Sequence, residues 1–288
     1  MRHIKVPGAG REQGADEAMA SGLETLLVVD IGNTNIVCGL FVARELIRTA
    51  RFHSSVNRTA DEYYSLLIPF ITETGDINIT DVAIASVVPE LTRMWQHLFQ
   101  RHFELSAKII TALSPLGLQY RVADPGFIGA DLVVNAFAAW QKYHSSTIII
   151  DLGTATTVQF VTDKGSFEGT AIIPGMKTGA RNLFDKAALL SEIEISAPPA
   201  LIGTTTSAAL LSGIVNSHAF LLETYIHKLK QQYFDHKRIL TILTGGMADL
   251  LKPLMPSVDC VDKTLTLEGL MLAAEKLAAT VPTEQLRT

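Results

Sequence analysis

Two stretches of the chain repeat one uncommon pattern, and this repeat constrains the fold more than any other feature. Residues 30–37 read DIGNTNIV, and residues 151–158 read DLGTATTV. In the same register, each has an acid, an aliphatic residue, a glycine, several small polar residues and a valine. Each copy ends one apolar segment and begins another, so each joins two predicted strands. The chain is therefore predicted to consist of two halves built on one plan.

An acid-glycine turn of this kind has two interpretations. Asn and Gly tolerate the backbone angles of tight turns, so one copy alone is equally consistent with an ordinary hairpin. Two copies in register favour a nucleotide site. If the halves face each other across a cleft, the backbone N–H groups of both turns can bind phosphate oxygens, and the carboxylates can hold a cation that the phosphates share. Glycine is needed there because a Cβ would keep the backbone away from the phosphate.

Apolar periodicity predicts strands that alternate with helices. The first half is expected to contain three strands in a row, a helix capped by Thr59, a buried strand, a helix and a short strand: 26–31, 36–41, 45–53, 59–73, 81–89, 90–102 and 108–111. An apolar helix at 130–144 follows. Three strands then reappear, with two helices, a strand and a last helix behind them: 147–153, 156–163, 166–173, 175–190, 206–233, 238–246 and 267–279.

The reappearance of three consecutive strands sets the predicted domain boundary near residue 143. We expect two α/β domains at 24–143 and 144–280, with tails at 1–23 and 281–288. The first 22 residues lack the apolar centre of a signal peptide and are rich in Gly, Ala and charge, so they are interpreted as a flexible tail without function.

A third glycine turn supports nucleotide binding. In RILTILTGGMADLL, a β-branched strand leads into Thr244, Gly245 and Gly246, where a ring or sugar can lie on bare backbone. We expect Gly245 and Gly246 to contact ATP. The chain has neither a G-x-x-x-x-G-K-[ST] loop nor a G-x-G-x-x-G fingerprint, which removes the P-loop and Rossmann interpretations. The paired acid turns are instead typical of the nucleotide cleft of actin, hexokinase and the chaperone ATPases.

Composition excludes several classes of partner. The chain has 288 residues, of which 48% are hydrophobic and 18% charged, enough for a large core and two domains. A net charge of −5 without a Lys/Arg block predicts neither nucleic-acid nor membrane binding. Two cysteines and eight scattered histidines offer no transition-metal spacing, and such sparse cysteine fits a reducing, cytoplasmic setting.

Nine motifs in unbroken order, from about residue 26 to residue 278, resemble type III pantothenate kinases: DIGNTN with VCGLF, NRTADEY, SVVP, DPGFIGAD with VNAFAAW, DLGTATT, IIPGMKTGARNLF, IGTTTSAALLSGI, LTGGMADLL and LTLEGL. The resemblance implies duplicated ribonuclease H-like domains of the actin/hexokinase/chaperone-ATPase superfamily, with an ATP cleft between them. It also implies a homodimer that transfers the γ-phosphate of ATP to the primary hydroxyl of pantothenate, giving 4′-phosphopantothenate in the first step towards coenzyme A.

The resemblance also assigns roles to residues of this sequence. It places the general base at Asp131, an ATP contact at Thr154 and a monovalent-cation ligand, for potassium or ammonium, at Asp151. Asp30 is the expected Mg²⁺-side acid, directly or through water. The first phosphate loop comprises Asp30, Ile31, Gly32, Asn33, Thr34, Asn35, Ile36 and Val37, and the second runs from 151 to 157. The small-molecule substrate is expected to contact Val122, Gly129, Ala130, Asp131, Leu132 and Thr206.

The role of Asp131 has an alternative interpretation. Phosphoryl transfer needs a carboxylate to accept the alcohol proton, and Asp131 suits that role. An Asp directly before an apolar helix is also a common N-cap, so the residues alone favour neither interpretation. The family resemblance favours the base.

Two residues depart from the family pattern on the acceptor side. Leu132 stands where the family usually has an arginine, which would pair with a substrate carboxylate, and Val122 stands where it has a tyrosine. Three hypotheses follow: a pantothenate kinase that binds the carboxylate through another group, such as Arg181, Lys177 or a neighbouring subunit; a related kinase for a different hydroxy compound; or a non-catalytic ATP-binding accessory or regulatory protein. The intact Asp30, Asp131 and Asp151 count against the third.

Overall fold

The computed structural model describes residues 24–73, 78–186, 192–233, 235 and 238–280. The two predicted tails lie outside these residues. Backbone contacts divide the chain into two compact units, Met1–Ile110 and Thr111–Thr288. In the part of the chain that is described, no helix is both long enough and apolar enough to cross a membrane.

The first unit is built on a five-stranded sheet in the order β3-β2-β1-β4-β5. The hairpin strands β1 and β2 are antiparallel, as are β2 and β3, whereas β4 runs parallel to β1 and β5. Its elements are β1 (Thr25–Ile31), β2 (Asn35–Val42), β3 (Glu45–His53), α2 (Ala60–Thr72), β4 (Asp81–Ser86), α3 (Pro89–Phe103) and β5 (Lys108–Ile110). All seven predicted elements of this half are present.

Alternate residues of β1 and β2 enter one core together with α2 and α3. Leu27, Val29 and Ile31 of β1 pack with Tyr63 of α2 and Trp95 of α3, and all five are fully buried. The predicted cap of α2 is confirmed: Thr59 accepts a hydrogen bond from the Glu62 N–H, and the Glu62 side chain accepts one from the Thr59 N–H, which is a capping box.

The second unit is built on a six-stranded sheet in the order β11-β10-β7-β8-β9-β6. Its elements are β6 (Gln119–Tyr120), the 3₁₀ turn η1 (Pro125–Phe127), α4 (Ala130–Tyr143), β7 (Ser146–Leu152), β8 (Ala155–Val161), β9 (Ser166–Pro174), α5 (Met176–Lys186), α6 (Thr206–Leu211), the π-helical turn η2 (Ser212–Asn216), α7 (Ser217–Gln232), β10 (Ile239–Thr244), α8 (Ala248–Leu251), the 3₁₀ turn η3 (Lys252–Leu254), β11 (Cys260–Val261) and α9 (Leu265–Ala278).

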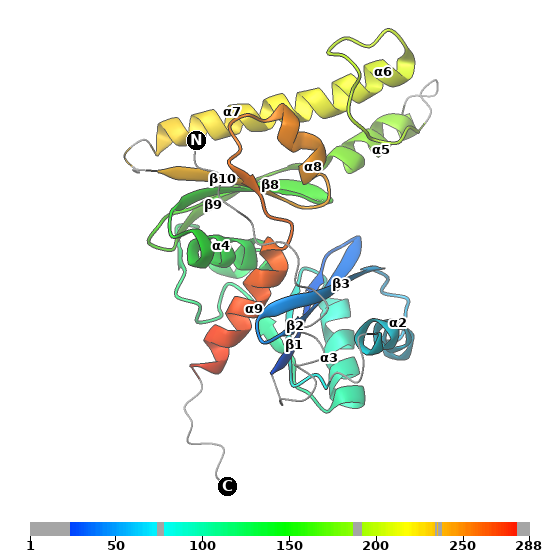
Figure 1. Cartoon of the computed structure of the whole chain (residues 1–288), viewed down its shortest axis with the longest axis vertical. Helices are drawn as coiled ribbons and strands as arrows, with labels where there is room; N and C mark the ends of the chain where they lie inside the picture. The colour runs from blue at the N-terminus through cyan, green and yellow to red at the C-terminus, as the bar shows by residue number, and fades with distance from the viewer. Residues whose placement is uncertain (1–23, 74–77, 187–191, 234, 236–237, 281–288) are drawn as a thin grey trace. The chain divides into compact units, whose positions relative to one another are not determined.

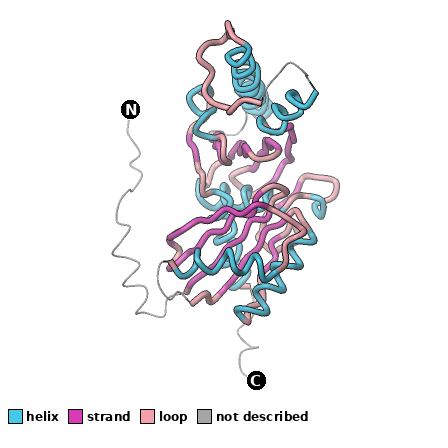
Figure 2. Tube along the Cα trace, turned by 90° about the vertical axis from the view of Figure 1, so that its right-hand side faces the viewer, coloured by secondary structure: helices cyan, strands magenta, loops and turns pink. Residues whose placement is uncertain are grey.

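Helices cover both faces of this second sheet. Ile148 and Ile150 of β7 pack with α7 and α8, whereas Ile149 between them packs with α4 and Leu265 of α9. Successive strand residues point to opposite faces, so a run of buried isoleucines serves two cores. Figure 1 shows α7 and α4 on opposite sides of these strands, and Figure 2 shows the helices in cyan beside the strands in magenta.

The two sheets share one topology. The order β3-β2-β1-β4-β5 in the first unit matches β9-β8-β7-β10-β11 in the second, and β6 adds one edge strand to the second. Each repeat also ends in a helix, α4 after β5 and α9 after β11. The predicted duplication is therefore visible in the strand order.

The domain boundary differs from the prediction. The sequence placed it near residue 143, at the end of the first repeat, whereas the contacts divide the chain after Ile110. The difference arises because α4 packs on β7, β8 and α9, which all belong to the second unit.

The long helix expected at 206–233 is interrupted. Its middle turn, Ser212–Asn216, is π-helical and contains a glycine. The Ser212 hydroxyl donates to the Leu201 carbonyl, and the Asn216 amide donates to the Ser212 hydroxyl at 3.1 Å. These side-chain bonds compete with the regular helical ladder.

The helix expected at 175–190 is described as far as Lys186, and its last four predicted residues lie outside the described part.

Candidate active site

The second acid turn joins β7 to β8 in the second unit. Asp151 pairs with Thr157 and Leu152 pairs with Thr156 across the hairpin, so three residues form the turn: Gly153, Thr154 and Ala155. The Gly153 N–H donates to the Ala155 carbonyl at 3.1 Å. Gly153 and Thr154 are exposed at the tip, as a ligand-binding turn requires.

The first acid turn joins β1 to β2 in the first unit and is one residue longer. Asp30 pairs with Val37 and Ile31 with Ile36, which leaves four residues in the turn. The Gly32 N–H donates to the Asn35 carbonyl at 2.9 Å, and a Cβ on Gly32 would lie 3.1 Å from that oxygen. Both acid turns are thus hairpins, and the amides of both glycines close their own turns. Phosphate binding by these turns would have to use their other amides.

The glycine turn after β10 lies against the second acid turn. The strand β10 runs parallel to β7, with Thr244 opposite Asp151. A Cβ on Gly245 would lie 2.6 Å from Asp151 Oδ1 and 2.7 Å from the Leu152 backbone, and φ of Gly245 is +87°. Only glycine fits this position. Gly246, in contrast, has open space where its Cβ would be.

Asp131 lies in the first turn of α4 and does not cap it. The N-cap is Gly129, with no side-chain cap bond, and Asp131 Oδ1 accepts from the Leu132 N–H at 2.9 Å. Burial raises the pKa of the Asp131 carboxyl, and this backbone bond partly opposes the rise. A carboxylate with a raised pKa is a better proton acceptor, which fits a general base.

The carboxylates of Asp131 and Asp151 interact. Burial, and then the charge of Asp131, raise the pKa of Asp151 to about 6, while a hydrogen bond from Asn135 opposes the rise. Two partly buried acids in electrostatic contact favour a bound cation, because a cation offsets their repulsion. The pair therefore fits the predicted monovalent cation at Asp151.

Other ligands to such a cation would have to come from elsewhere. Within the described ranges, no three His, Cys, Asp or Glu side chains come together in a group that could hold a metal. When a protein offers such a cation few side-chain ligands, backbone carbonyl oxygens, water and nucleotide phosphates usually complete its coordination.

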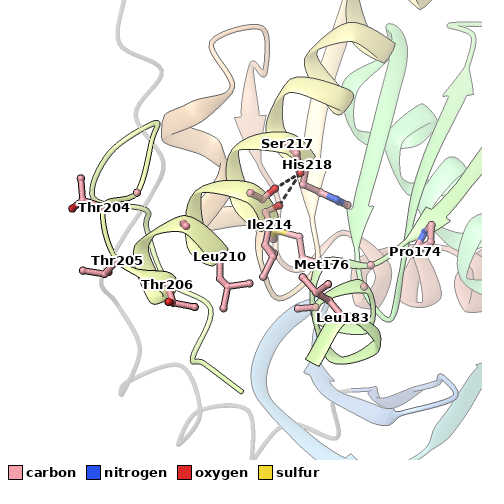
Figure 3. Close-up of a pocket in the computed structure, with 16 residues that line it drawn as sticks. Pro174, Met176, Leu183, Thr204, Thr205, Thr206, Leu210, Ile214, Ser217 and His218 are labelled. Atoms are coloured by element: carbon pink, nitrogen blue, oxygen red, sulfur yellow. Dashed lines mark hydrogen bonds between the residues drawn. The ribbon is translucent and has the colours of Figure 1, made fainter. Parts of the chain in front are cut away.

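A pocket of about 760 Å³ adjoins the second acid turn (Figure 3). Its lining includes Gly175, which donates its N–H to the Thr154 carbonyl at 3.2 Å, and His218, whose Nε2 lies 2.9 Å from the Thr156 hydroxyl. A Cβ on Gly175 would lie 2.5 Å from two carbonyl oxygens of the turn, so α5 begins in direct contact with it. Thr206, the predicted substrate contact at the start of α6, lines this pocket.

The sequence comparisons decide the family. The model of the type III pantothenate kinase family matches residues 26–228. A curated type III pantothenate kinase of Geotalea daltonii is 35% identical over 253 residues, which are 87% of this chain and 98% of that protein. The one of Geobacter sulfurreducens is 36% identical over 253 residues, with the same two shares. This chain belongs to the type III pantothenate kinase family.

The fold comparison agrees with the predicted fold class. The activator of 2-hydroxyisocaproyl-CoA dehydratase from Clostridium difficile, solved with bound ADPNP, matches with a TM-score of 0.51 at 12% identity, over 90% of this chain and 98% of that one. Such low identity speaks to the fold alone. The match shows a mixed α/β fold with two sheets, as the sequence predicts, and the family makes the chain an ATP-dependent kinase.

Within this pantothenate kinase family member, the predicted acceptor residues are spread over several environments. Gly129 and Ala130 precede Asp131 at the start of α4. Val122 packs against the core between the sheet and α4, and the Leu132 side chain is only 6% exposed. Neither Val122 nor Leu132 lines the pocket that contains Thr206.

Sequence reasoning missed Asn135, the buried residue that contacts Asp151. Its Nδ2 donates to Asp151 Oδ2 at 3.0 Å. One signal for it was present: Asn135 lies four residues after Asp131, so both fall on one face of an otherwise apolar helix.

Proposed function

We propose that this chain phosphorylates pantothenate on its primary hydroxyl with ATP as donor, the first step of coenzyme A synthesis. One observation carries the proposal for this member of the family. Burial raises the pKa of both Asp131 on α4 and Asp151 on β7, and the charge of Asp131 raises the pKa of Asp151 further. In phosphoryl transfer to an alcohol, one carboxylate can accept the alcohol proton and another can hold a cation near the phosphates.

In the proposed reaction, the oxygen of the pantothenate hydroxyl bonds to the γ-phosphorus of ATP, and Asp131 accepts the proton of that hydroxyl. The bond between that phosphorus and the β,γ-bridging oxygen breaks, and ADP leaves with the electron pair. The transition state is loose, so the protein mainly positions the reactants and neutralises charge on the phosphate oxygens.

We assign ATP binding to the three glycine turns. The turn at 30–37 and Thr154 are the proposed phosphate contacts, with Asp30 on the Mg²⁺ side, directly or through water. Gly245 and Gly246 are the proposed contacts for the nucleoside. Asp151 is the proposed ligand of a monovalent cation, K⁺ or NH₄⁺, which would add positive charge beside the phosphates.

The proposed acceptor residues are Val122, Gly129, Ala130, Leu132 and Thr206. The pocket behind the second acid turn supports Thr206, because its volume of about 760 Å³ suits a small molecule. The pantothenate carboxylate needs a cation, and Lys177 and Arg181 are exposed on α5, the helix that lines this pocket. They are the proposed replacements for the arginine that the family has at position 132.

The test is turnover of the purified protein with ATP, Mg²⁺, K⁺ and pantothenate, following ADP and the phosphorylated product. Asp131→Asn removes the base but keeps the shape, so kcat should fall by about 10²- to 10⁴-fold while ATP still binds. Asp124→Asn is the matched control: Asp124 is exposed seven residues earlier and caps the 3₁₀ turn η1. It should keep kcat.

Other acceptors decide between the hypotheses. A panel of small hydroxy compounds should show no better substrate than pantothenate. Turnover with another alcohol alone, or ATP binding without any turnover, would contradict the proposal.

We further propose a cytoplasmic homodimer. The reaction needs ATP, which the cytoplasm supplies, and both Cys38 and Cys260 are free thiols, which fits a reducing compartment. Four large apolar side chains of the second unit are well exposed and support a subunit interface: Leu201 at 62%, Ile202 at 80%, Phe220 at 54% and Leu221 at 41%. Light scattering should give twice the chain mass, and Phe220→Glu should shift it to the monomer.

A further inference from the structure

Asn135 is a fully buried amide with both ends occupied. It lies on α4 with no exposed surface. Its Nδ2 donates to Asp151 Oδ2 at 3.0 Å, and its Oδ1 accepts from the Thr266 hydroxyl of α9 at 2.7 Å. Burying an amide in an apolar helix face costs free energy unless the amide is hydrogen-bonded. Asp151 and Thr266 supply the two partners that Asn135 needs.

The chemistry of Thr266, Asn135 and Asp151 fixes which group donates and which accepts in each of their two hydrogen bonds. An ionised carboxylate only accepts, so Asn135 must turn its NH₂ group towards Asp151. Its carbonyl then faces α9, and the residue there must donate. Thr266 supplies an O–H donor, whereas valine of the same shape supplies none. The hydroxyl of Thr266 therefore determines which way the Asn135 amide points.

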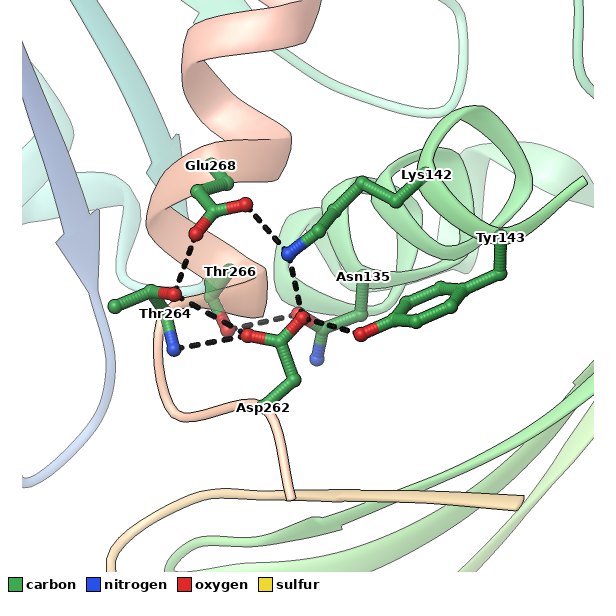
Figure 4. A network of polar contacts seen from close by, with 7 residues as sticks. All are labelled: Asn135, Lys142, Tyr143, Asp262, Thr264, Thr266 and Glu268. Carbon is green, nitrogen blue, oxygen red and sulfur yellow. Dashed lines mark hydrogen bonds and ion pairs between the residues drawn. The ribbon is translucent and has the colours of Figure 1, made fainter. Parts of the chain in front are cut away.

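The start of α9 is fixed against α4 by a second set of polar contacts (Figure 4). Lys142 of α4 donates to Asp262 and to Glu268, each at 2.5 Å, and Tyr143 donates to Asp262 at 2.8 Å. Asp262 and Glu268 in turn accept from the Thr264 hydroxyl, at 3.2 and 2.5 Å. These bonds hold the first turn of α9 in place.

Close backbone packing completes the arrangement. A Cβ on Gly269 would lie 2.3 Å from the Val134 carbonyl oxygen, so the two helices approach as nearly as glycine allows. Val134 is the neighbour of Asn135 in α4. The approach brings Thr266 within hydrogen-bonding distance of the amide, although the two residues are 131 positions apart in the chain.

We propose that Thr266 and Asn135 are positioning residues for Asp151. The α9 hydroxyl orients the amide, and the amide holds one carboxylate oxygen of Asp151, which leaves the other directed for its ligand. The inference rests on the proposed function, in which Asp151 binds a monovalent cation beside ATP. It adds a role for α9, all of which lies beyond the residues 26–228 that the family model matches.

Three variants of the full-length protein test the proposal. Thr266→Val removes the donor and keeps the shape, and Thr266→Ser keeps the donor. Thr264→Val is the matched control, because Thr264 also loses a hydroxyl at the start of α9 but contacts Asp262 and Glu268 rather than Asn135. Each variant is measured in two ways: the rise of the melting temperature with KCl against choline chloride, without substrates, and the K⁺ dependence of pantothenate turnover.

The expected results separate positioning from general stability. Thr266→Val should raise the K⁺ concentration for half-maximal effect by about tenfold or more in both measurements, as is usual when a partner of a metal ligand is lost. Thr266→Ser should stay within about twofold of the wild type. Thr264→Val should lower the melting temperature and leave the half-maximal K⁺ concentration unchanged, because the bonds of Lys142 to Asp262 and Glu268 still hold α9 against α4.

Two outcomes overturn the proposal in distinguishable ways. If the wild type responds to K⁺ and Thr266→Val responds identically, or if Thr264→Val shifts the K⁺ response equally, positioning is wrong while the proposed function stands. If the wild type shows neither a K⁺-dependent melting shift nor turnover, the proposed function is wrong and the inference falls with it.

Discussion

The charge of Asp131, in the first turn of α4, acts on the carboxylate of Asp151 at the end of β7. Burial, and to a lesser extent the charge of Asp131, raise the pKa of Asp151 to about 6. Burial also raises the pKa of Asp131. Both acids therefore ionise less readily in the folded chain than in the unfolded chain. A protein keeps such a pair at the expense of stability, which is typical of functional sites.

Asp151→Asn should make the ligand-free protein more stable at pH 8. The unfolded chain releases the Asp151 proton near pH 3.9, whereas the folded chain holds it until about pH 6. The stabilising contribution of the protonated acid is complete below pH 3.9 and is lost as pH rises through 6. The loss is on the order of 3 kcal/mol, and asparagine avoids it.

Urea unfolding at pH 4 and pH 8, without ATP or K⁺, measures this effect. The advantage of Asp151→Asn should be present at pH 8 and small at pH 4. An equal advantage at both pH values would mean that packing rather than ionisation is responsible. The same variant should lose turnover, because the amide cannot replace the carboxylate as a cation ligand.

The two glycines after β10 should respond differently to alanine. Gly245→Ala meets Asp151 Oδ1 and the Leu152 backbone within 2.7 Å, and it strains a backbone with φ of +87°. It should cost at least about 2 kcal/mol of unfolding free energy. Gly246→Ala has open space, so stability should change by less than about 0.5 kcal/mol.

ATP binding separates the two roles. Because ATP is proposed to lie on the bare backbone at 245 and 246, Gly246→Ala should weaken ATP binding while its urea midpoint stays at the wild-type value. Isothermal titration with a non-hydrolysable ATP analogue gives the affinity. Unchanged ATP affinity in Gly246→Ala would remove Gly246 from the proposed site.

Much of the fold could be predicted from the sequence because local residue patterns determine it. The strand periodicity, the Thr59 cap and the two acid turns depend on residues close together in sequence, and the structure contains each of them. The duplication was readable for the same reason, since one turn pattern occurs twice. The shared strand order follows from that repetition.

The rest depends on packing between distant segments. The contact boundary falls after Ile110 because α4 packs on β7 and α9, which the sequence of α4 does not specify. The contact of Thr266 with Asn135 likewise needs the close approach at Gly269. The π-helical turn at Ser212–Asn216 depends on Ser212 meeting the Leu201 carbonyl, which no helical pattern predicts.

His218 should make the protein less stable in mild acid. Burial lowers the pKa of this imidazole, which contacts the Thr156 hydroxyl. The unfolded chain takes up a proton near pH 6.5, but the folded chain does so only at lower pH, so stability is complete above 6.5 and falls as pH drops below it. His218→Gln should reduce this fall in the melting temperature between pH 7 and pH 5.

A threonine variant controls for the lost hydrogen bond. Thr156→Val removes the contact and keeps the imidazole, so it should lower the melting temperature at every pH and retain the acid sensitivity. If Thr156→Val abolishes the acid sensitivity as well, the hydrogen bond rather than protonation of His218 is responsible. The two acids of the site contribute with the opposite sign, so variants rather than the wild-type curve must be compared.

Leu132→Arg should lower the KM for pantothenate. An arginine at this position is what the family usually has, and its planar fork can hold a carboxylate by two hydrogen bonds. The KM should fall about tenfold. The kcat should change little, because the carboxylate is remote from the reacting hydroxyl. Leu132 is only 6% exposed, so losing its packing should also cost about 2 to 4 kcal/mol of stability. Leu132→Ala is the control: it should lose similar stability and gain nothing in KM. An unchanged KM in Leu132→Arg would contradict this prediction and would mean that a side chain at position 132 does not reach the carboxylate.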